Sequence, residues 1–126
     1  MKIDHIALWV KDLERSKDFY TRYFSGQAHP KYTNVKKGFT SYFITFETGA
    51  RLELMHRREL KKNPKDAHLG WAHIAFSLGS KEAVDAKTKA ITDDGYPLVG
   101  APRTTGDGYY ESVVSDPDGN LIELTV

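Results

Sequence analysis

Two histidines and two glutamates stand at equivalent places in the two halves of this 126-residue chain. The sequence HIAL at residues 5–8 recurs as HIAF at residues 73–76, and LEL at residues 52–54 recurs as IEL at residues 122–124. Alternation with apolar neighbours predicts strands whose imidazoles and carboxylates point to one side of a sheet. Carboxylates gathered there without partners would be costly, whereas a divalent cation binds imidazole nitrogen and carboxylate oxygen together. The pattern therefore predicts one metal site with four ligands: His5, Glu53, His73 and Glu123.

Each of these four residues, taken alone, has an ordinary structural interpretation. A lone histidine in a strand is commonly a half-buried hydrogen-bonding group, and a lone glutamate commonly faces solvent. The symmetric placement of two histidines and two glutamates favours the metal site over that interpretation. The other three histidines have no symmetric counterparts and are predicted to lie at the surface: His29, His56 and His68.

The elements that must position these residues follow from the same repeat. It predicts two copies of one module, about residues 1–56 and 71–126, within a single domain and joined by a linker over residues 57–70. Each module reads as a strand, a helix and three further strands. The predicted strands cover residues 2–10, 27–34, 39–47, 50–56, 71–78, 97–102, 109–115 and 121–126.

Helices are predicted over residues 12–24 and 81–93, where apolar residues recur with a helical period. Asp12 and Ser80 are the expected N-caps, because each can accept from the first-turn amides. Gly26 and Gly95 are the expected stop signals, because glycine readily adopts the left-handed conformation that ends a helix.

Composition excludes several classes of function. The chain has no cysteine, so disulfides and thiolate chemistry are absent, and its net charge of +1 gives no basic excess for nucleic-acid binding. No apolar run approaches the roughly 18 residues of a membrane helix. We therefore expect a cytoplasmic protein with no nucleic-acid or membrane partner. The basic residues of the 57–70 segment fit either a solvated linker or a lid that attracts an anionic ligand.

Strand parity also predicts the walls of a pocket. Trp9 shares the face of His5, and Trp71 shares the face of His73. A tight turn at residues 48–49 would pair Ile44 with Glu53, so that Tyr42, Ile44 and Phe46 face inward. The same counting across residues 116–120 sets Glu111 and Val113 beside Glu123. The pocket residues predicted in this way are Trp9, Tyr42, Ile44, Trp71, Glu111 and Val113.

A glycine-rich loop is predicted over residues 100–108, long enough to close over such a pocket. Its one cation, Arg103, is a candidate for holding a substrate carboxylate.

The sequence resembles the vicinal oxygen chelate (VOC) superfamily, which includes glyoxalase I, fosfomycin-resistance proteins, bleomycin-binding proteins and extradiol dioxygenases. The resemblance covers essentially the whole chain. It is carried by residues 5–7 (HIA), 12–20 (DLERSKDFY), 52–54 (LEL), 70–76 (GWAHIAF) and 116–124 (DPDGNLIEL). It implies an α+β fold, in which two βαβββ modules form a cupped mixed sheet around one metal site.

The ligand order His–Glu–His–Glu matches the glyoxalase I branch, whereas fosfomycin-resistance proteins and extradiol dioxygenases use His–His–Glu. The resemblance implies a metal-dependent lyase or isomerase, similar to lactoylglutathione lyase. In that chemistry a metal holds two adjacent substrate oxygens and stabilises an enediolate, while Glu123 or Glu53 moves a proton between neighbouring carbons. One divalent ion (zinc, nickel, cobalt, manganese or iron), a small-molecule substrate and a homodimer are expected.

Two departures concern the thiol part of the substrate. Members that use glutathione carry an arginine where this chain has Trp9, and an asparagine where it has Arg57. The resemblance therefore leaves the thiol open. The alternative is a binding or antibiotic-resistance protein of the same fold that sequesters a small molecule, with or without metal.

Overall fold

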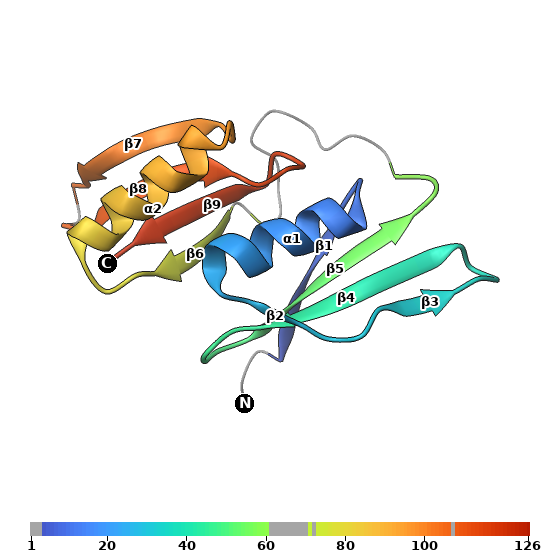
Figure 1. Cartoon of the computed structure of the whole chain (residues 1–126). Coiled ribbons are helices and arrows are strands. Elements are labelled where there is room, and N and C mark those ends of the chain that lie inside the picture. Colours follow the sequence, from blue (N-terminus) through green and yellow to red (C-terminus); the bar gives the residue numbers. More distant parts are fainter. Residues whose placement is uncertain (1–3, 61–70, 72, 107) are drawn as a thin grey trace. The chain divides into compact units, whose positions relative to one another are not determined.

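The computed structural model describes residues 4–60, 71, 73–106 and 108–126. The chain divides into two compact units, Met1–Asn63 and Pro64–Val126. Their boundary falls within the segment that the sequence predicts as a linker. Within these described residues there are two helices and nine strands in two mixed sheets, which matches the predicted pair of βαβββ modules (Figure 1). Neither helix is long and apolar enough to cross a membrane, as far as the described residues go.

The first unit packs one helix on a five-stranded sheet. Its elements in chain order are β1 (His5–Trp9), α1 (Leu13–Phe24), β2 (Gln27–Ala28), β3 (Tyr32–Asn34), β4 (Phe39–Thr45) and β5 (Arg51–Arg57). The strand order is β1-β5-β4-β2, with β3 also paired to β4. Only β1 and β5 run parallel among these pairs. The predicted strand over residues 27–34 is thus two short strands.

The helix α1 follows its predicted N-cap and ends at residue 24 as predicted, but the left-handed residue that ends it is not the predicted one. The Asp12 carboxylate accepts from the Arg15 amide and caps the first turn. At the other end Ser25, not Gly26, takes the left-handed conformation, with φ of 52°. Gly26 is needed for a different reason: a Cβ there would lie 2.5 Å from Cγ2 of Ile44, closer than real side chains approach.

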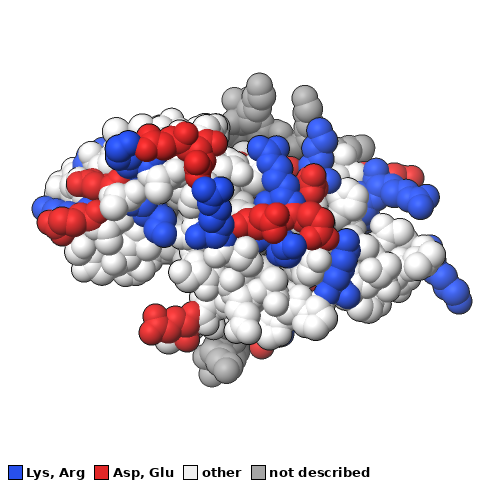
Figure 2. Space-filling model, in the orientation of Figure 1, with Lys and Arg blue, Asp and Glu red and all other residues white. Residues whose placement is uncertain are grey.

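The outer side of α1 carries a cluster of ion pairs. Glu14 accepts from Lys17 and Lys31, each at 2.9 Å, and from the Tyr42 hydroxyl at 3.1 Å. These hydrogen bonds, that of Lys17 first, lower the pKa of Glu14 to about 2. Around each helix, taken unit by unit, acidic and basic side chains are interspersed (Figure 2). Neither sign of charge dominates there, in keeping with the net charge of +1.

The second unit repeats the plan with a four-stranded sheet. Its elements are β6 (His73–Ser77), α2 (Lys81–Asp93), β7 (Leu98–Thr104), β8 (Tyr110–Ser115) and β9 (Leu121–Thr125), in the sheet order β6-β9-β8-β7. The Ser80 hydroxyl caps α2 by accepting from Ala83, and Gly95 has a φ of 89° just past the helix end, both as predicted.

Each helix covers one face of its own sheet and makes the core there. In the first unit the buried apolar sheet residues are Ile44, Leu52 and Leu54; in the second they are Val114, Ile122 and Leu124. A buried polar pair also joins α2 to β8, because the hydroxyls of Thr88 and Ser112 lie 2.6 Å apart. Residues that alternate with these in sequence, among them Glu53 and Glu123, lie on the opposite face of each sheet.

The pairing of β4 with β5 differs from prediction by one residue. Phe43, not Ile44, lies opposite Glu53, and Ile44 lies opposite Leu52. The cause is the connection between the strands: it spans residues 46–50 and includes Gly49 at φ of 89°, so it is longer than the predicted two-residue turn. A shift of one residue exchanges the two faces of a strand.

The strand β7 is longer than predicted and takes in half of the predicted loop. Residues 100–104, which the sequence also assigns to that loop, belong to β7, and Gly100, Arg103 and Thr104 pair with β8. Pro102 is tolerated because β7 is the edge of its sheet. The connection that remains runs from residue 105 to 109.

Candidate metal centre

Each unit carries one histidine–glutamate pair on the sheet face opposite its helix. Leu52 and Leu54 are 3% and 0% exposed against the helix side, so Glu53 between them faces the other way. Glu123 is set in the same manner between Ile122 and Leu124. In both units the histidine comes from the neighbouring parallel strand, two residues before the alanine that pairs with the glutamate.

The two pairs have nearly the same geometry. Nε2 of His5 lies 3.9 Å from Oε2 of Glu53, and Nε2 of His73 lies 3.5 Å from Oε2 of Glu123. Two donors that each bind one ion at about 2.0–2.2 Å can be at most about 4.4 Å apart. Both distances satisfy this limit, so each pair fits as two ligands of one divalent cation.

Neither pair is a complete site by itself. Among the described residues, no group of three or more histidine, aspartate or glutamate side chains is close enough to hold one ion. Two donors leave most positions of a four- to six-coordinate ion open. The four-ligand site expected from the sequence needs both pairs, and it remains a prediction.

The first pair is supported by charged and aromatic neighbours. Asp4 accepts a hydrogen bond from Nδ1 of His5 at 2.9 Å and a second one from the Arg51 guanidinium. These two bonds, that of His5 first, lower the pKa of Asp4. An ionised carboxylate can only accept, so Nδ1 is the donor here; in a neutral imidazole with this tautomer the lone pair is on Nε2, the nitrogen that faces Glu53.

Phe43 completes this support. Its ring meets the His5 ring edge-on with centroids 5.3 Å apart, and the Arg51 guanidinium lies 4.4 Å from its centroid. Sequence analysis missed Asp4, Arg51 and Phe43. The first two carry a signal, since an acidic residue precedes His5 and a basic one lies two residues before Glu53. Phe43 was missed because the predicted register of β4 and β5 was wrong by one residue.

The second pair has apolar neighbours at the equivalent positions. Leu121 pairs with His73 where Arg51 pairs with His5, and Val113 pairs with Glu123 where Phe43 pairs with Glu53. The two pairs are therefore equivalent in their histidine and glutamate side chains and different in their surroundings.

The sequence predicts that Trp9 and Trp71 line the pocket. Trp9 lies in β1 on the same face as His5. It is 44% exposed, its ring meets Phe39 edge-on, and the Arg57 guanidinium lies 4.7 Å from its centroid. Trp71 lies before β6, outside any strand, with 82% of its surface exposed.

Tyr42 and Ile44 do not line this face, contrary to the prediction. The Tyr42 hydroxyl reaches Glu14 on α1, and Ile44 is fully buried on the same side. Phe46 lies in the β4–β5 connection, where its ring comes within 3.2 Å of a Cβ built on Gly26. All three errors follow from the shifted register of β4 and β5.

In the second unit the predicted register is confirmed. Val113 lies opposite Glu123, and Glu111 is two residues farther along the same face. Arg103 donates from Nη2 to Oε1 of Glu111 at 3.2 Å. Arg103 is thus a strand residue with a carboxylate partner rather than a cation on a free loop.

The two other described histidines make different contacts. His29 is exposed and lies 3.1 Å from the Thr45 hydroxyl, as expected for a surface residue. His56 is half-buried rather than at the surface, because its Nδ1 donates to the Val10 carbonyl. His68 and most of the basic 57–70 segment lie outside the described residues.

The chain is similar over nearly its whole length to proteins of two bacteria. "Uncharacterized protein YqjT" of Bacillus subtilis (strain 168) is 30% identical over 125 residues, which cover 95% of this chain and 94% of that protein. The "Probable lactoylglutathione lyase" of Vibrio parahaemolyticus is 29% identical over 130 residues, which cover 98% of this chain and 88% of that one.

Solved structures of glyoxalase I share the fold. The enzyme of Leishmania major, described as trypanothione-dependent, gives a TM-score of 0.79 at 23% identity over 99% of this chain and 86% of its own. The enzyme of Zea mays gives 0.82 at 23% identity over 98% of this chain, which spans only 44% of the maize chain. The profile of one family matches residues 2–124. The chain belongs to the Glyoxalase/Bleomycin resistance protein/Dioxygenase superfamily.

Proposed function

We propose that this protein is a metal-dependent lyase or isomerase of the glyoxalase I type, acting on a small substrate with adjacent oxygens. The observation that carries the proposal is the repeated histidine–glutamate pair, at 3.9 Å in one unit and 3.5 Å in the other. Family membership and the relative named "Probable lactoylglutathione lyase" support the same class of reaction.

The proposed ligands are His5, Glu53, His73 and Glu123, around one zinc, nickel, cobalt, manganese or iron ion. The four donors come from one chain or from two chains of a homodimer. A bound divalent ion supplies Lewis-acid stabilisation of the negative charge that develops on substrate oxygens.

Proton transfer is the part of the reaction assigned to the protein. Glu123 takes the proton from the carbon next to the substrate carbonyl and returns it to the neighbouring carbon. With a hemithioacetal as substrate, this converts the ketone and the thiol-bearing carbinol into a hydroxyacyl thioester, with no other reactant consumed. The Glu123 side chain is 20% exposed beside Val113, so a proton held there is partly shielded from water.

The experiment compares Glu123→Gln with Glu53→Gln, which are equivalent changes in the two units. Hemithioacetals of a 2-oxoaldehyde with several thiols serve as substrates, and metal content is measured on the same samples. We expect Glu123→Gln to abolish turnover while metal still binds, more weakly. Unchanged turnover in that variant would contradict the assigned role.

Metal analysis distinguishes the class of function. Each chain carries two histidine–glutamate pairs and so supplies the donors for one ion. Wild-type protein purified without chelator should therefore contain close to one divalent ion per chain, or take it up on titration. A chain with no affinity for any of the five metals would instead be a binding or resistance protein of the same fold.

A further inference from the structure

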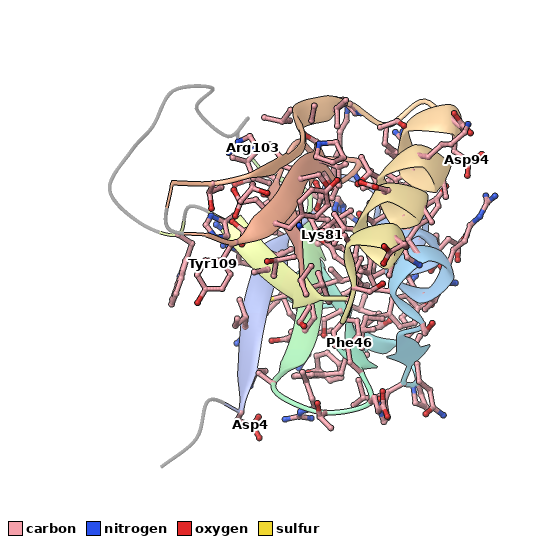
Figure 3. All side chains as sticks on the ribbon, turned by 90° about the vertical axis from the view of Figure 1, so that its left-hand side faces the viewer. Asp4, Phe46, Lys81, Asp94, Arg103 and Tyr109 are labelled. Carbon is pink, nitrogen blue, oxygen red and sulfur yellow. The ribbon has the colours of Figure 1, made fainter. Side chains whose placement is uncertain are left out.

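We propose that Arg103 forms a carboxylate-binding subsite beside Glu123, so that the substrate carries an acidic group beyond an apolar segment. This inference rests on the proposed function, because it extends the site around Glu123. It concerns the second unit alone, on the sheet face away from α2. Arg103 projects from β7 on that side (Figure 3).

The pairing of β7 with β8 is irregular, and the irregularities decide on which face of the sheet the Arg103 side chain lies. Leu98 pairs with Val114, Gly100 with Val113, and Arg103 with Glu111, with a register shift in each interval. Such bulges add a residue to one strand and turn the side chains that follow. Because of them, Arg103 shares the face of Glu111 and Val113.

The guanidinium is held over the row of residues that ends at Glu123. Its Nη1 lies 3.1 Å from where a Cβ on Gly100 would stand, and Gly100 pairs with Val113. Val113 in turn pairs with Glu123. The absence of a side chain at residue 100 thus lets the guanidinium lie back along the sheet. It stands two strand spacings, roughly 10 Å, from the backbone of Glu123.

Glu111 orients the guanidinium without using all of its donors. Its side chain is 14% exposed, whereas that of Arg103 is 52% exposed. Within the described part of the chain, the guanidinium of Arg103 makes one hydrogen bond, from Nη2 to Glu111. A guanidinium has five donors, so a face of it remains available for a second carboxylate.

The surface between Arg103 and Glu123 is apolar. A hollow of about 450 Å³ is lined by Val99, Gly100, Ala101, Pro102, Arg103, Val113 and Leu121. Leu121 is 37% exposed and lies two residues before Glu123 on the same face. A ligand there meets hydrocarbon along its length and a fixed cation at one end, an arrangement typical of binding sites for small acidic molecules.

The apolar hollow and the separation of Arg103 from Glu123 define the class of ligand. Adjacent oxygens belong at the Glu123 end, a segment of two or three methylene groups lies over Val113 and Leu121, and a carboxylate meets Arg103. 2-Oxoglutarate has this arrangement and serves as a probe. 5-Methyl-2-oxohexanoate is its matched control, because an isopropyl group replaces the distal carboxylate on the same carbon skeleton.

The test measures the dissociation constants of both probes for the metal-loaded protein by calorimetry. We expect wild type to bind 2-oxoglutarate at least about tenfold more tightly than the control, as charge-assisted hydrogen bonds to arginine allow. Arg103→Met should remove that preference and leave the affinity for 5-methyl-2-oxohexanoate unchanged. Arg103→Lys should keep part of it, since lysine retains the charge but not the planar donors. Arg22→Met, which removes an exposed arginine from α1, should keep all of it.

A second measurement separates this inference from the proposed function. Propionate and propionamide are titrated into metal-free protein, and the Nε–Hε resonance of Arg103 is followed. A saturable shift with propionate alone supports the subsite whether or not a metal binds. Equal affinity of wild type for the two oxo acids, a preference retained by Arg103→Met, or equal responses to propionate and propionamide would each overturn it. Failure of wild type to bind metal would overturn the proposed function instead.

Discussion

The hydrogen bond between Asp4 and His5 provides a sharp test of how the first pair is held. Asp4 accepts the Nδ1 proton of His5 at 2.9 Å and is itself fixed by Arg51. Asp4→Ala removes this acceptor and leaves His5, Glu53 and Phe43 in place. The imidazole then loses the contact that fixes both its tautomer and its ring orientation.

The structure sets the expected size of the effect. Loss of an acceptor behind a metal-binding histidine lowers metal affinity by about 10- to 100-fold. The Asp4 side chain is 63% exposed, so water can replace it in part. The edge-on contact of the His5 ring with Phe43, at 5.3 Å, also persists in the variant. We therefore expect a loss near the lower end, about tenfold.

Zinc affinity is measured by competition with a chromophoric chelator, and the tautomer of His5 by ¹⁵N NMR of the metal-free protein. Asp18→Ala is the matched control, because it also removes one exposed carboxylate of the first unit, and Asp18 contacts Lys17 rather than His5. Asp4→Ala should weaken zinc binding and reduce the Nδ1-protonated form of His5. Unchanged affinity with an unchanged tautomer would refute the reasoning, and an equal loss in Asp18→Ala would assign the effect to net charge.

Two further predictions concern stability. Glu14→Gln should lower the free energy of unfolding by at most about 1 kcal/mol at pH 7, because the ion pairs of Glu14 are partly exposed. Its pKa is lowered from 4.5 to about 2, so the contribution is present in full above pH 4.5 and lost as the pH falls toward 2; urea unfolding of both proteins across this range checks it. Thr88→Val should cost about 1–3 kcal/mol, because the buried Ser112 hydroxyl loses its partner. Adding Ser112→Ala should restore part of that loss; a double variant less stable than Thr88→Val would show that the hydroxyl pair is not coupled.

The helices and the direction of the key side chains could be predicted because both depend on short stretches of sequence. Asp12 and Ser80 cap the helices that follow them, and the period of two around Glu53 and Glu123 fixes which way these carboxylates point. Local patterns of this kind need no knowledge of what the strand pairs with. The donors of each pair were therefore found from the sequence.

Strand register could not be predicted with the same success. The register of each hairpin depends on the length of its connection. Residues 46–50 form a longer connection than the turn inferred from Thr48-Gly49, whereas residues 116–120 give the predicted register. The error at the first connection exchanged Phe43 for Ile44 beside Glu53. The irregularities of β7 escaped for a related reason, because a bulge depends on the partner strand as much as on the residues that form it.

The two units share their histidine–glutamate pairs but differ in the residues around them. Equivalent positions in the two units carry the same histidine and glutamate at similar distances, 3.9 and 3.5 Å, so the two pairs follow from the shared plan of the sheets. Neighbouring positions are not constrained in this way, and they differ: Arg51 and Phe43 in one unit correspond to Leu121 and Val113 in the other. One histidine is thereby fixed by an ionised carboxylate, while the other pair borders an apolar hollow that ends at Arg103. Under the proposed function we therefore expect substitutions at Asp4 to alter metal affinity and substitutions at Arg103 to alter substrate selection, so that the two properties can change independently.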